Sequence, residues 1–180
     1  MLFISFPILS QINGEDCTNP IPIPSIPYLS IGNTLNANDD YYASCPDYGN
    51  QGGAGDIVYE YINGPSNIYV DISLCQDITD YDSQLYVFKN NCNGSSISCQ
   101  EDGCQSPNYS APYNSRITAQ LFESNTTYYI VVDGYSSSSN GNYQLNVDLS
   151  IGLTAPDSTN LPLVLIQTNN QQIVDEPKIN

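Results

Sequence analysis

The sequence predicts an all-β protein, an antiparallel, jelly-roll-like β-sandwich braced by disulfide bonds. Short segments in which apolar and polar residues alternate recur between Asp56 and Ser150, separated by turn residues, and this spacing is typical of antiparallel sandwiches. The composition agrees, because Tyr, Ile, Val, Thr, Ser, Asn and Gly dominate while Lys and Glu are scarce. Six cysteines form an even set that suits disulfide bonds.

The charge of the chain excludes one class of partner. Three Lys and Arg residues against nineteen Asp and Glu residues give a formal net charge of -16. Nucleic-acid binding needs clustered basic residues to neutralise phosphates, so we expect no nucleic-acid partner. Fifteen tyrosines and a hydrophobic content of 40% argue against disorder in the middle of the chain.

The cysteines indicate an oxidising compartment, because disulfides persist there and are rare in the cytosol. A zinc site would need ligands at short spacing, often with histidine, and this chain has no histidine and no CxxC. Six cysteines allow about 15 pairings. Proximity favours Cys92–Cys99, and elimination then gives Cys17–Cys45 and Cys75–Cys104.

Residues 1–10 resemble a truncated signal segment. Leu2–Leu9 is apolar but lacks a basic start, and Ser10 is a small residue before a cleavage point at Gln11. The alternative is a buried strand. The segment is too short to cross a bilayer, which takes about 20 apolar residues. Together with the cysteines, it predicts a protein that is secreted or on the cell surface, without a membrane span.

Residues 11–55 form a Pro- and Asn-rich segment that leads into the sandwich. Cys17–Pro27 carries four prolines and predicts an extended edge segment, because proline lacks the backbone donor that a central strand needs. Ser30–Gly55 reads as a long loop with one short strand near Asn33–Leu35.

Residues 56–150 form the core of the sandwich, with turns at Asn63-Gly64-Pro65 and Asn93-Gly94. Residues 151–160 read as a linker, and residues 161–180 as the start of a following module that opens with the apolar Pro162–Thr168. The predicted strands are Ile57–Tyr61, Asn67–Leu74, Gln84–Phe88, Ser98–Gln100, Ser115–Leu121, Thr127–Val132 and Asn142–Leu149.

Two acidic segments are candidates for a calcium site. Asp77, Asp80 and Asp82 fall between the strands Asn67–Leu74 and Gln84–Phe88. Glu101 and Asp102 lie before Cys104, and a Cys75–Cys104 bridge would bring them alongside. Ca²⁺ takes about six to eight oxygen ligands, which loops supply readily. The alternative is that these acids solvate a loop and cap turns.

Tyrosines in loops are candidates for contact with a polysaccharide or a protein surface, because an exposed ring offers apolar area and a hydroxyl. Tyr59, Tyr128 and Tyr143 stand at strand positions, where packing is the ordinary use. Sequons that could carry glycans occur at Asn93, Asn108 and Asn125. The loop candidates are Tyr41, Tyr42, Tyr48, Tyr109, Tyr113 and Tyr135.

The inventory of side chains argues against catalysis. Without histidine, neither a Ser-His-Asp nor a Cys-His arrangement can be built. Ser-Lys chemistry would need Lys89 or Lys178, and neither lies in a recognisable motif. Paired carboxylates remain conceivable, but acids are abundant throughout the chain. We expect no enzyme.

The middle of the chain resembles a known family, from Gly55 to Val147. The runs GDIVYEYINGPSNIYVDISLC, YDSQLYVFKNNCNGSSISCQEDGC and SNTTYYIVVDGYSSSSNGNYQLNV are similar to the bacterial pre-peptidase C-terminal (PPC-like) module. That resemblance implies a jelly-roll sandwich appended to secreted peptidases and other extracellular proteins, itself not catalytic. The tail LPLVLIQTNNQQIVDEPKI is similar to the opening of CotH-like (spore-coat kinase-like) regions.

The expected function is therefore a non-catalytic accessory or surface-binding module of a larger secreted protein, associated with adhesion or secretion and stabilised by calcium. Its partners would be other domains of the same protein and a polysaccharide or protein surface ligand. One alternative is a subunit of an extracellular filament, in which Pro162–Thr168 completes a neighbour's sheet. Another is the N-terminal part of an enzyme, a CotH-like kinase or a peptidase, whose catalytic part lies elsewhere.

Overall fold

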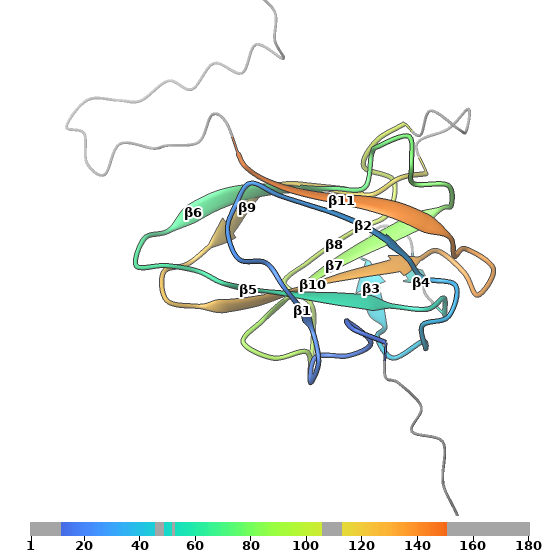
Figure 1. Cartoon of the computed structure of the whole chain (residues 1–180), viewed down its shortest axis with the longest axis horizontal. Helices are drawn as coiled ribbons and strands as arrows, with labels where there is room; N and C mark the ends of the chain where they lie inside the picture. The colour runs from blue at the N-terminus through green and yellow to red at the C-terminus, as the bar shows by residue number, and fades with distance from the viewer. Residues whose placement is uncertain (1–11, 46–48, 52, 106–112, 151–180) are drawn as a thin grey trace, which may run out of the picture.

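The computed structural model describes residues 12–45, 49–51, 53–105 and 113–150, without the side chains of 43–45 and 49–51 (Figure 1). Several predicted features therefore lie outside the described residues: the signal segment, the linker 151–160, the tail 161–180, Tyr48, Tyr109 and Asn108. The side chain of Cys45 lies outside them as well.

The predicted all-β sandwich is confirmed, and no helix occurs among the described residues. In Figure 1 two sheets lie one above the other, with the small β3–β4 pair beside them. One sheet has the order β1-β5-β10-β7-β8 and the other β2-β11-β6-β9. The bounds of the first sheet are β1 Ile21–Pro22, β5 Ile57–Ile62, β10 Thr127–Gly134, β7 Ser83–Lys89 and β8 Ser98–Gln100. Those of the rest are β2 Tyr28–Asn33, β11 Asn142–Leu149, β6 Ile68–Ser73, β9 Arg116–Phe122, β3 Ala43–Cys45 and β4 Gly49–Gln51.

Strands that follow one another in the chain mostly lie in opposite sheets. β6 belongs to the four-stranded sheet and β7 to the five-stranded sheet, so the acidic loop between them crosses from one layer to the other. All strand neighbours are antiparallel except β1 and β5, which run parallel. The proline-rich segment supplies the edge strand β1, as its composition predicts.

The strand expected near Asn33–Leu35 lies earlier in the chain, as β2. Tyr28, Ser30 and Gly32 are half buried and alternate with exposed neighbours, which is the period of a strand with one packed face. Pro27 ends the run of prolines just before β2, so the backbone donors that pair with β11 are present from Tyr28 onward.

The core fills the space between the two sheets and is built from inward-facing residues of both. Tyr59 and Tyr143 cross this space from opposite sheets, and their hydroxyls lie 2.8 Å apart. Gly32 is opposite Tyr143 in the β2–β11 register, and a Cβ at that glycine would collide with the Tyr143 ring. A larger residue at Gly32 would therefore displace a ring of the core.

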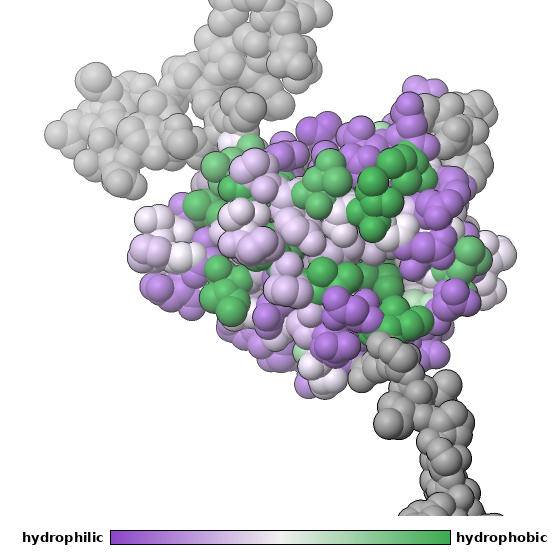
Figure 2. Space-filling model, viewed as in Figure 1, coloured by the Kyte–Doolittle hydropathy of each residue, from purple (hydrophilic) through white to green (hydrophobic). Residues whose placement is uncertain are grey.

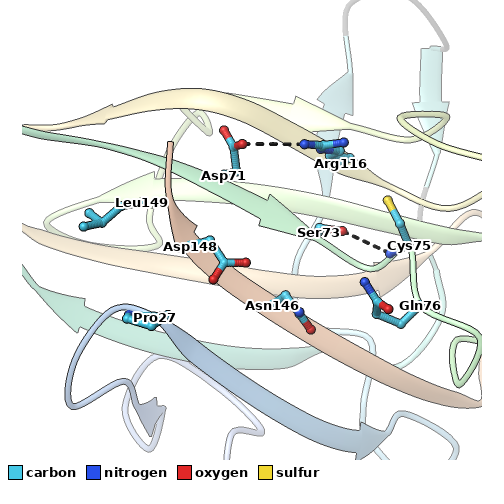
Figure 3. Close-up of a pocket in the computed structure, with 9 residues that line it drawn as sticks. All are labelled: Pro27, Asp71, Ser73, Cys75, Gln76, Arg116, Asn146, Asp148 and Leu149. Carbon is cyan, nitrogen blue, oxygen red and sulfur yellow. Dashed lines mark hydrogen bonds and ion pairs between the residues drawn. The ribbon is translucent and has the colours of Figure 1, made fainter. Parts of the chain in front are cut away.

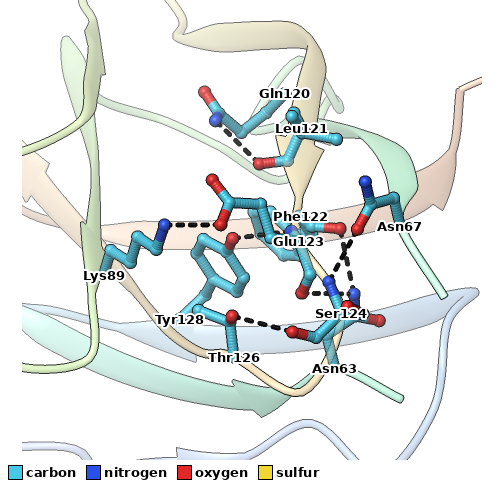
Figure 4. A network of polar contacts seen from close by, with 10 residues as sticks. All are labelled: Asn63, Asn67, Lys89, Gln120, Leu121, Phe122, Glu123, Ser124, Thr126 and Tyr128. Atoms are coloured by element: carbon cyan, nitrogen blue, oxygen red, sulfur yellow. Dashed lines mark hydrogen bonds and ion pairs between the residues drawn. The ribbon is translucent and has the colours of Figure 1, made fainter. Parts of the chain in front are cut away.

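One buried amide joins two turns at the end of the sandwich (Figure 4). The Asn63 Nδ2 group donates to the carbonyls of Ser66 at 3.0 Å, Phe122 at 2.9 Å and Glu123 at 2.8 Å. The turn from β5 to β6 is thereby fastened to the turn from β9 to β10. Lys89 reaches the same region through an ion pair of 2.8 Å with Glu123.

Disulfides connect segments that are distant in the chain, and they correct part of the predicted pairing. Cys75–Cys104 is present as predicted, with Cα atoms 6.0 Å apart. Cys17 pairs with Cys92, with Cα atoms 6.3 Å apart, so the predicted Cys17–Cys45 and Cys92–Cys99 pairings are wrong. Cys92 lies in the turn after β7, whereas Cys99 lies inside β8 opposite Tyr86, several residues back from that turn. Cys17 from the N-terminal segment packs against the same small core cluster as Cys92, so the partner of Cys92 comes from a distant part of the chain. Cys99 is disulfide-bonded too.

Exposed apolar residues are dispersed over the surface. In the view of Figure 2 hydrophobic residues form separate patches between polar ones. The β2 residues Leu29 and Ile31, exposed by 56% and 60%, belong to this set. Within the described ranges, no helix is long and apolar enough to cross a membrane.

Candidate functional site

An acidic pocket collects residues from three separate segments. It has a volume of about 270 Å³ and is lined by Asp82, Glu101, Asp102, Tyr113 and Tyr135. Three of these are predicted calcium ligands and two are predicted contact tyrosines. The loop after β8 lies beside the loop before β7, as the Cys75–Cys104 bridge predicts.

Backbone hydrogen bonds fix the three segments to one another. The Tyr135 N–H donates to the Asp82 carbonyl at 3.0 Å, and the Ser83 N–H donates to the Tyr113 carbonyl at 3.0 Å. The Ser115 hydroxyl donates to the Glu101 carbonyl at 2.9 Å. Because these bonds involve main-chain atoms, the fold sets the backbone positions of the acidic residues, and the side chains remain able to rotate.

Burial and mutual repulsion disfavour the charged forms of these acids. Burial, and then the charges of Asp102 and Asp82, raise the pKa of Glu101 to about 7. Burial and the charge of Asp102 raise the pKa of Asp82 to about 6. Glu101 is only 3% exposed, and one carboxylate oxygen of Glu101 and one of Asp82 are buried with no hydrogen-bond partner. The pocket thus offers unsatisfied acceptors that a cation would satisfy.

Asp77 and Asp80 are not among the residues that line this pocket. Asp80 accepts hydrogen bonds from the backbone and side-chain nitrogens of Asn142, both at 2.8 Å, and so fixes the start of β11. Gly141 makes this contact feasible, because a Cβ there would collide with Asp80 Oδ1. Asp77 is exposed on the same loop.

The acids of the pocket are not arranged as a finished metal site. Among the described residues, no group of three or more Cys, Asp and Glu side chains stands close enough to hold a metal ion. The donor chemistry suits calcium, because carboxylate oxygens are its preferred ligands. Binding would require the side chains of Asp82, Glu101 and Asp102 to rotate toward a common centre.

A second hollow lies on the outer face of the four-stranded sheet (Figure 3). It is a groove of about 730 Å³ whose lining includes the predicted disulfide residue Cys75 but none of the predicted calcium ligands or contact tyrosines. Asp71 and Arg116 form an ion pair of 3.5 Å across β6 and β9, and Asn146 and Asp148 project from β11 beside them. The lining mixes acidic, basic, amide and apolar side chains, so it does not favour one class of ligand, and no function is assigned to this groove.

Sequence reasoning missed a pair of buried acids, Asp56 and Asp133. Both side chains are fully buried at neighbouring positions, Asp56 directly before β5 and Asp133 in β10. A signal was available in the sequence, because Asp133 ends the run Tyr128–Val132 in a strand that is buried on both faces. A carboxylate in such a strand is costly unless it is neutralised or hydrogen-bonded.

The described candidates for surface contact differ in exposure. Tyr42, Tyr113 and Tyr135 are exposed, whereas the Tyr41 hydroxyl accepts a hydrogen bond of 2.7 Å from the Cys17 N–H and its ring lies beside Phe88. Tyr41 therefore serves the packing of the N-terminal segment. The sequon residues Asn93 and Asn125 are both exposed in turns.

Comparison with known proteins finds similarity to a solved structure. No family model matches the chain, and no curated protein matches it either. The chain is similar to the pre-peptidase C-terminal domain of a collagenase from Bacillus anthracis, with 13% identity and a TM-score of 0.47 over 72% of this chain and 94% of that chain. The β-sandwich fold rests on the strands and sheets described above, and fold by itself does not carry function. The CotH-like resemblance falls on residues outside the described part of the chain.

Proposed function

We propose that this chain is a non-catalytic accessory module of a larger extracellular protein, used for surface attachment and stabilised by calcium in the acidic pocket. The observation that carries the calcium part is the convergence of Asp82, Glu101 and Asp102 on one pocket, with buried oxygens that no described group satisfies. The extracellular part is supported by disulfides that join distant segments, since such bonds persist in oxidising compartments.

Calcium should stabilise the folded protein, and its effect is measurable by thermal unfolding. A ligand that binds only the folded state adds RT ln(1 + [L]/Kd) to stability. With millimolar calcium and a Kd near ~10 µM, a value in the range of loop sites, the gain is about 2.7 kcal/mol. The melting temperature should then rise by several degrees. Magnesium at equal concentration in about 0.15 M salt controls for screening of the net charge.

Matched variants separate the pocket from general charge effects. Asp82→Asn with Glu101→Gln should abolish the response to calcium. Asp77→Asn with Asp148→Asn changes the formal net charge equally at exposed positions and should keep the response to calcium. Equal shifts with calcium and magnesium, or a calcium response that survives in the pocket variant, would show that these acids only solvate the loops.

The pH dependence gives an independent test of the same site. Without calcium, folding raises the pKa of Glu101 and of Asp82. Their contribution is therefore fully present below the unfolded pKa values near ~4, and it is lost as pH rises through about 6 and 7. Calcium requires the deprotonated carboxylates, so its affinity should increase from pH 5.5 to pH 7.5. Calorimetric titration at both pH values measures this, and an affinity independent of pH would place the ion elsewhere.

One observation favours a second function, a filament subunit. Within the described part of the chain, β2 pairs only with β11, so its other edge is open, and it carries the exposed Leu29 and Ile31. An open edge is where an extended segment of another chain can add a strand. A subunit of this kind should assemble in size-exclusion chromatography, and Leu29→Lys with Ile31→Lys should prevent assembly, whereas an accessory module should elute as a monomer.

A further inference from the structure

The buried acids Asp56 and Asp133 lie side by side with no basic residue to neutralise them. The β5–β10 register pairs Ile57 with Val132, so the two acids stand at the next position, and their carboxyl groups are in hydrogen-bond contact. Both are 0% exposed. Lys89 and Arg116, the basic residues among those the structure describes, pair with Glu123 and Asp71 instead.

A count of donors shows what is missing between the two groups. Asp56 Oδ2 accepts the backbone N–H groups of Asp40 at 2.8 Å and Tyr41 at 2.7 Å. Asp133 Oδ1 accepts the Gly134 N–H at 2.6 Å. The Tyr86 hydroxyl lies 2.7 Å from Asp133 Oδ2 and 2.6 Å from Gln84 Oε1, and we assign its single proton to the carboxylate, because a charged acceptor binds a donor more strongly than an amide oxygen does. Asp56 Oδ1 is buried and receives no donor. If both groups were ionised, two acceptors would face each other without a proton between them.

We propose that Asp56 is protonated at Oδ1 in the folded protein and donates this proton to the Asp133 carboxylate, so that the pair is a pH-sensitive latch for residues 38–41. In this state Asp56 Oδ2 is a carbonyl oxygen that accepts two N–H groups. Asp133 is a carboxylate that accepts three donors. One proton therefore satisfies every oxygen of the pair and leaves one negative charge, which is fully hydrogen-bonded.

The latch fastens a specific segment to the sandwich. The Asp56 N–H donates to the Asn38 carbonyl at 2.9 Å. The Asp56 carboxyl group accepts hydrogen bonds from the backbone N–H groups of Asp40 and Tyr41. Tyr41 in turn accepts the Cys17 N–H, so the N-terminal segment is held through the same contacts. Loss of the proton would place two charges in contact beneath this segment and loosen it.

The surroundings of the pair offer no compensating charge. Burial first, and then the charge of the neighbouring acid, raises the pKa of Asp56, and burial raises that of Asp133. Asp39 adds repulsion to both. The titratable groups that face the pair are all acids or phenols: Asp39 and Tyr41 from the preceding loop, Tyr81 from the loop before β7, and Tyr86 from β7.

The sign of the pH effect follows from the raised pKa values. The contribution of the latch is fully present below the unfolded pKa near ~4 and is lost as pH rises through the folded values. Where the folded state holds one proton more than the unfolded state, the folding equilibrium constant falls about tenfold per pH unit.

Urea unfolding from pH 5.5 to pH 9 in the presence of a chelator tests the latch. Asp133→Asn replaces the acceptor by an amide that donates to an ionised Asp56, so the folded variant no longer holds the extra proton. The pH dependence of its folding equilibrium constant should therefore be weaker than that of wild type by about tenfold per pH unit. Asp148→Asn removes one charge from an exposed position of β11 and should keep the wild-type slope. Contributions of Asp82 and Glu101 are common to all three proteins and cancel in the comparison. Equal slopes in wild type and Asp133→Asn would overturn the proposal.

Carbon-13 NMR of the carboxyl groups in the wild-type protein provides a test that needs no variant. Asp56 should show the chemical shift of a protonated acid at pH 6.5, and titration midpoints below pH 5 for both acids would overturn the proposal.

The alternative is a cation that occupies the place of the proton between the two carboxyl groups. If calcium abolishes the pH slope in the Asp82→Asn, Glu101→Gln protein, an ion bridges the pair and the proton does not. That outcome would leave the calcium proposal for the acidic pocket untouched.

Discussion

At the scale of single residues, Asn63 shows how much one buried amide can hold. Asn63→Ala would leave the carbonyl oxygens of Ser66, Phe122 and Glu123 without this donor at the end of the sandwich. Because unsatisfied buried groups cost about 1–3 kcal/mol, we expect a loss of about 2–3 kcal/mol in urea unfolding. The matched control Asn67→Ala removes one exposed hydrogen bond to the Ser124 N–H and should cost under about 1 kcal/mol. Similar losses in both variants would mean that the two turns are held by other contacts.

The sequence located acidic residues but could not rank them. Asp80 and Asp82 look alike in sequence, yet Asp80 fixes Asn142 while Asp82 lines the pocket. That difference arises from strands distant in sequence, because Asn142 opens β11 and Glu101 follows β8. The buried pair of Asp56 and Asp133 depends likewise on the pairing of β5 with β10, which alternation along a single strand does not encode.

At the scale of elements, the disulfides Cys17–Cys92 and Cys75–Cys104 should contribute differently to the free energy of unfolding. A disulfide stabilises largely by restricting the unfolded chain, and the effect grows with the loop that it closes. Cys17–Cys92 spans 75 residues and Cys75–Cys104 spans 29. Replacement of either pair by serine should cost about 2–5 kcal/mol, with Cys17–Cys92 costing about 0.8 kcal/mol more. Urea unfolding of the two double variants measures this. A reversed order would show that Cys75–Cys104 contributes through the packing around the acidic pocket.

Strands were predictable, but their partners were not. The strands Ser98–Gln100 and Asn142–Leu149 match their predicted bounds. In Asn142–Leu149 one buried face imposes the alternation that predicted the strand. The strand near Asn33–Leu35 was misplaced, since β2 contains Ser30 and Gly32 on its packed face in place of apolar residues. The disulfide pairing failed for a related reason: sequence proximity of Cys92 and Cys99 does not report that one lies in a turn and the other inside a strand.

At the scale of the whole molecule, the sandwich should be stable without the tail. The Ser150 N–H donates to the Tyr69 carbonyl at 2.9 Å, so Ser150 still belongs to the sheet. A chain that ends at Ser150 should keep its melting temperature within a few degrees, because the predicted linker 151–160 lies beyond the alternating strands. A large drop in melting temperature would mean that Pro162–Thr168 pairs with the sandwich, for which the open edge of β2 is available.

The order of the strands in the two sheets also determines when the chain can fold during synthesis. β10 lies between β5 and β7, and β11 lies between β2 and β6, so the central pairings of both sheets depend on the last two described strands. The five-stranded sheet lacks a central strand until Gly134 has emerged from the ribosome, and the four-stranded sheet lacks one until Leu149 has emerged. Strand pairing between distant segments is slow in any case. The central strands of both sheets are therefore the last described strands to be synthesised, and the sandwich cannot close before them.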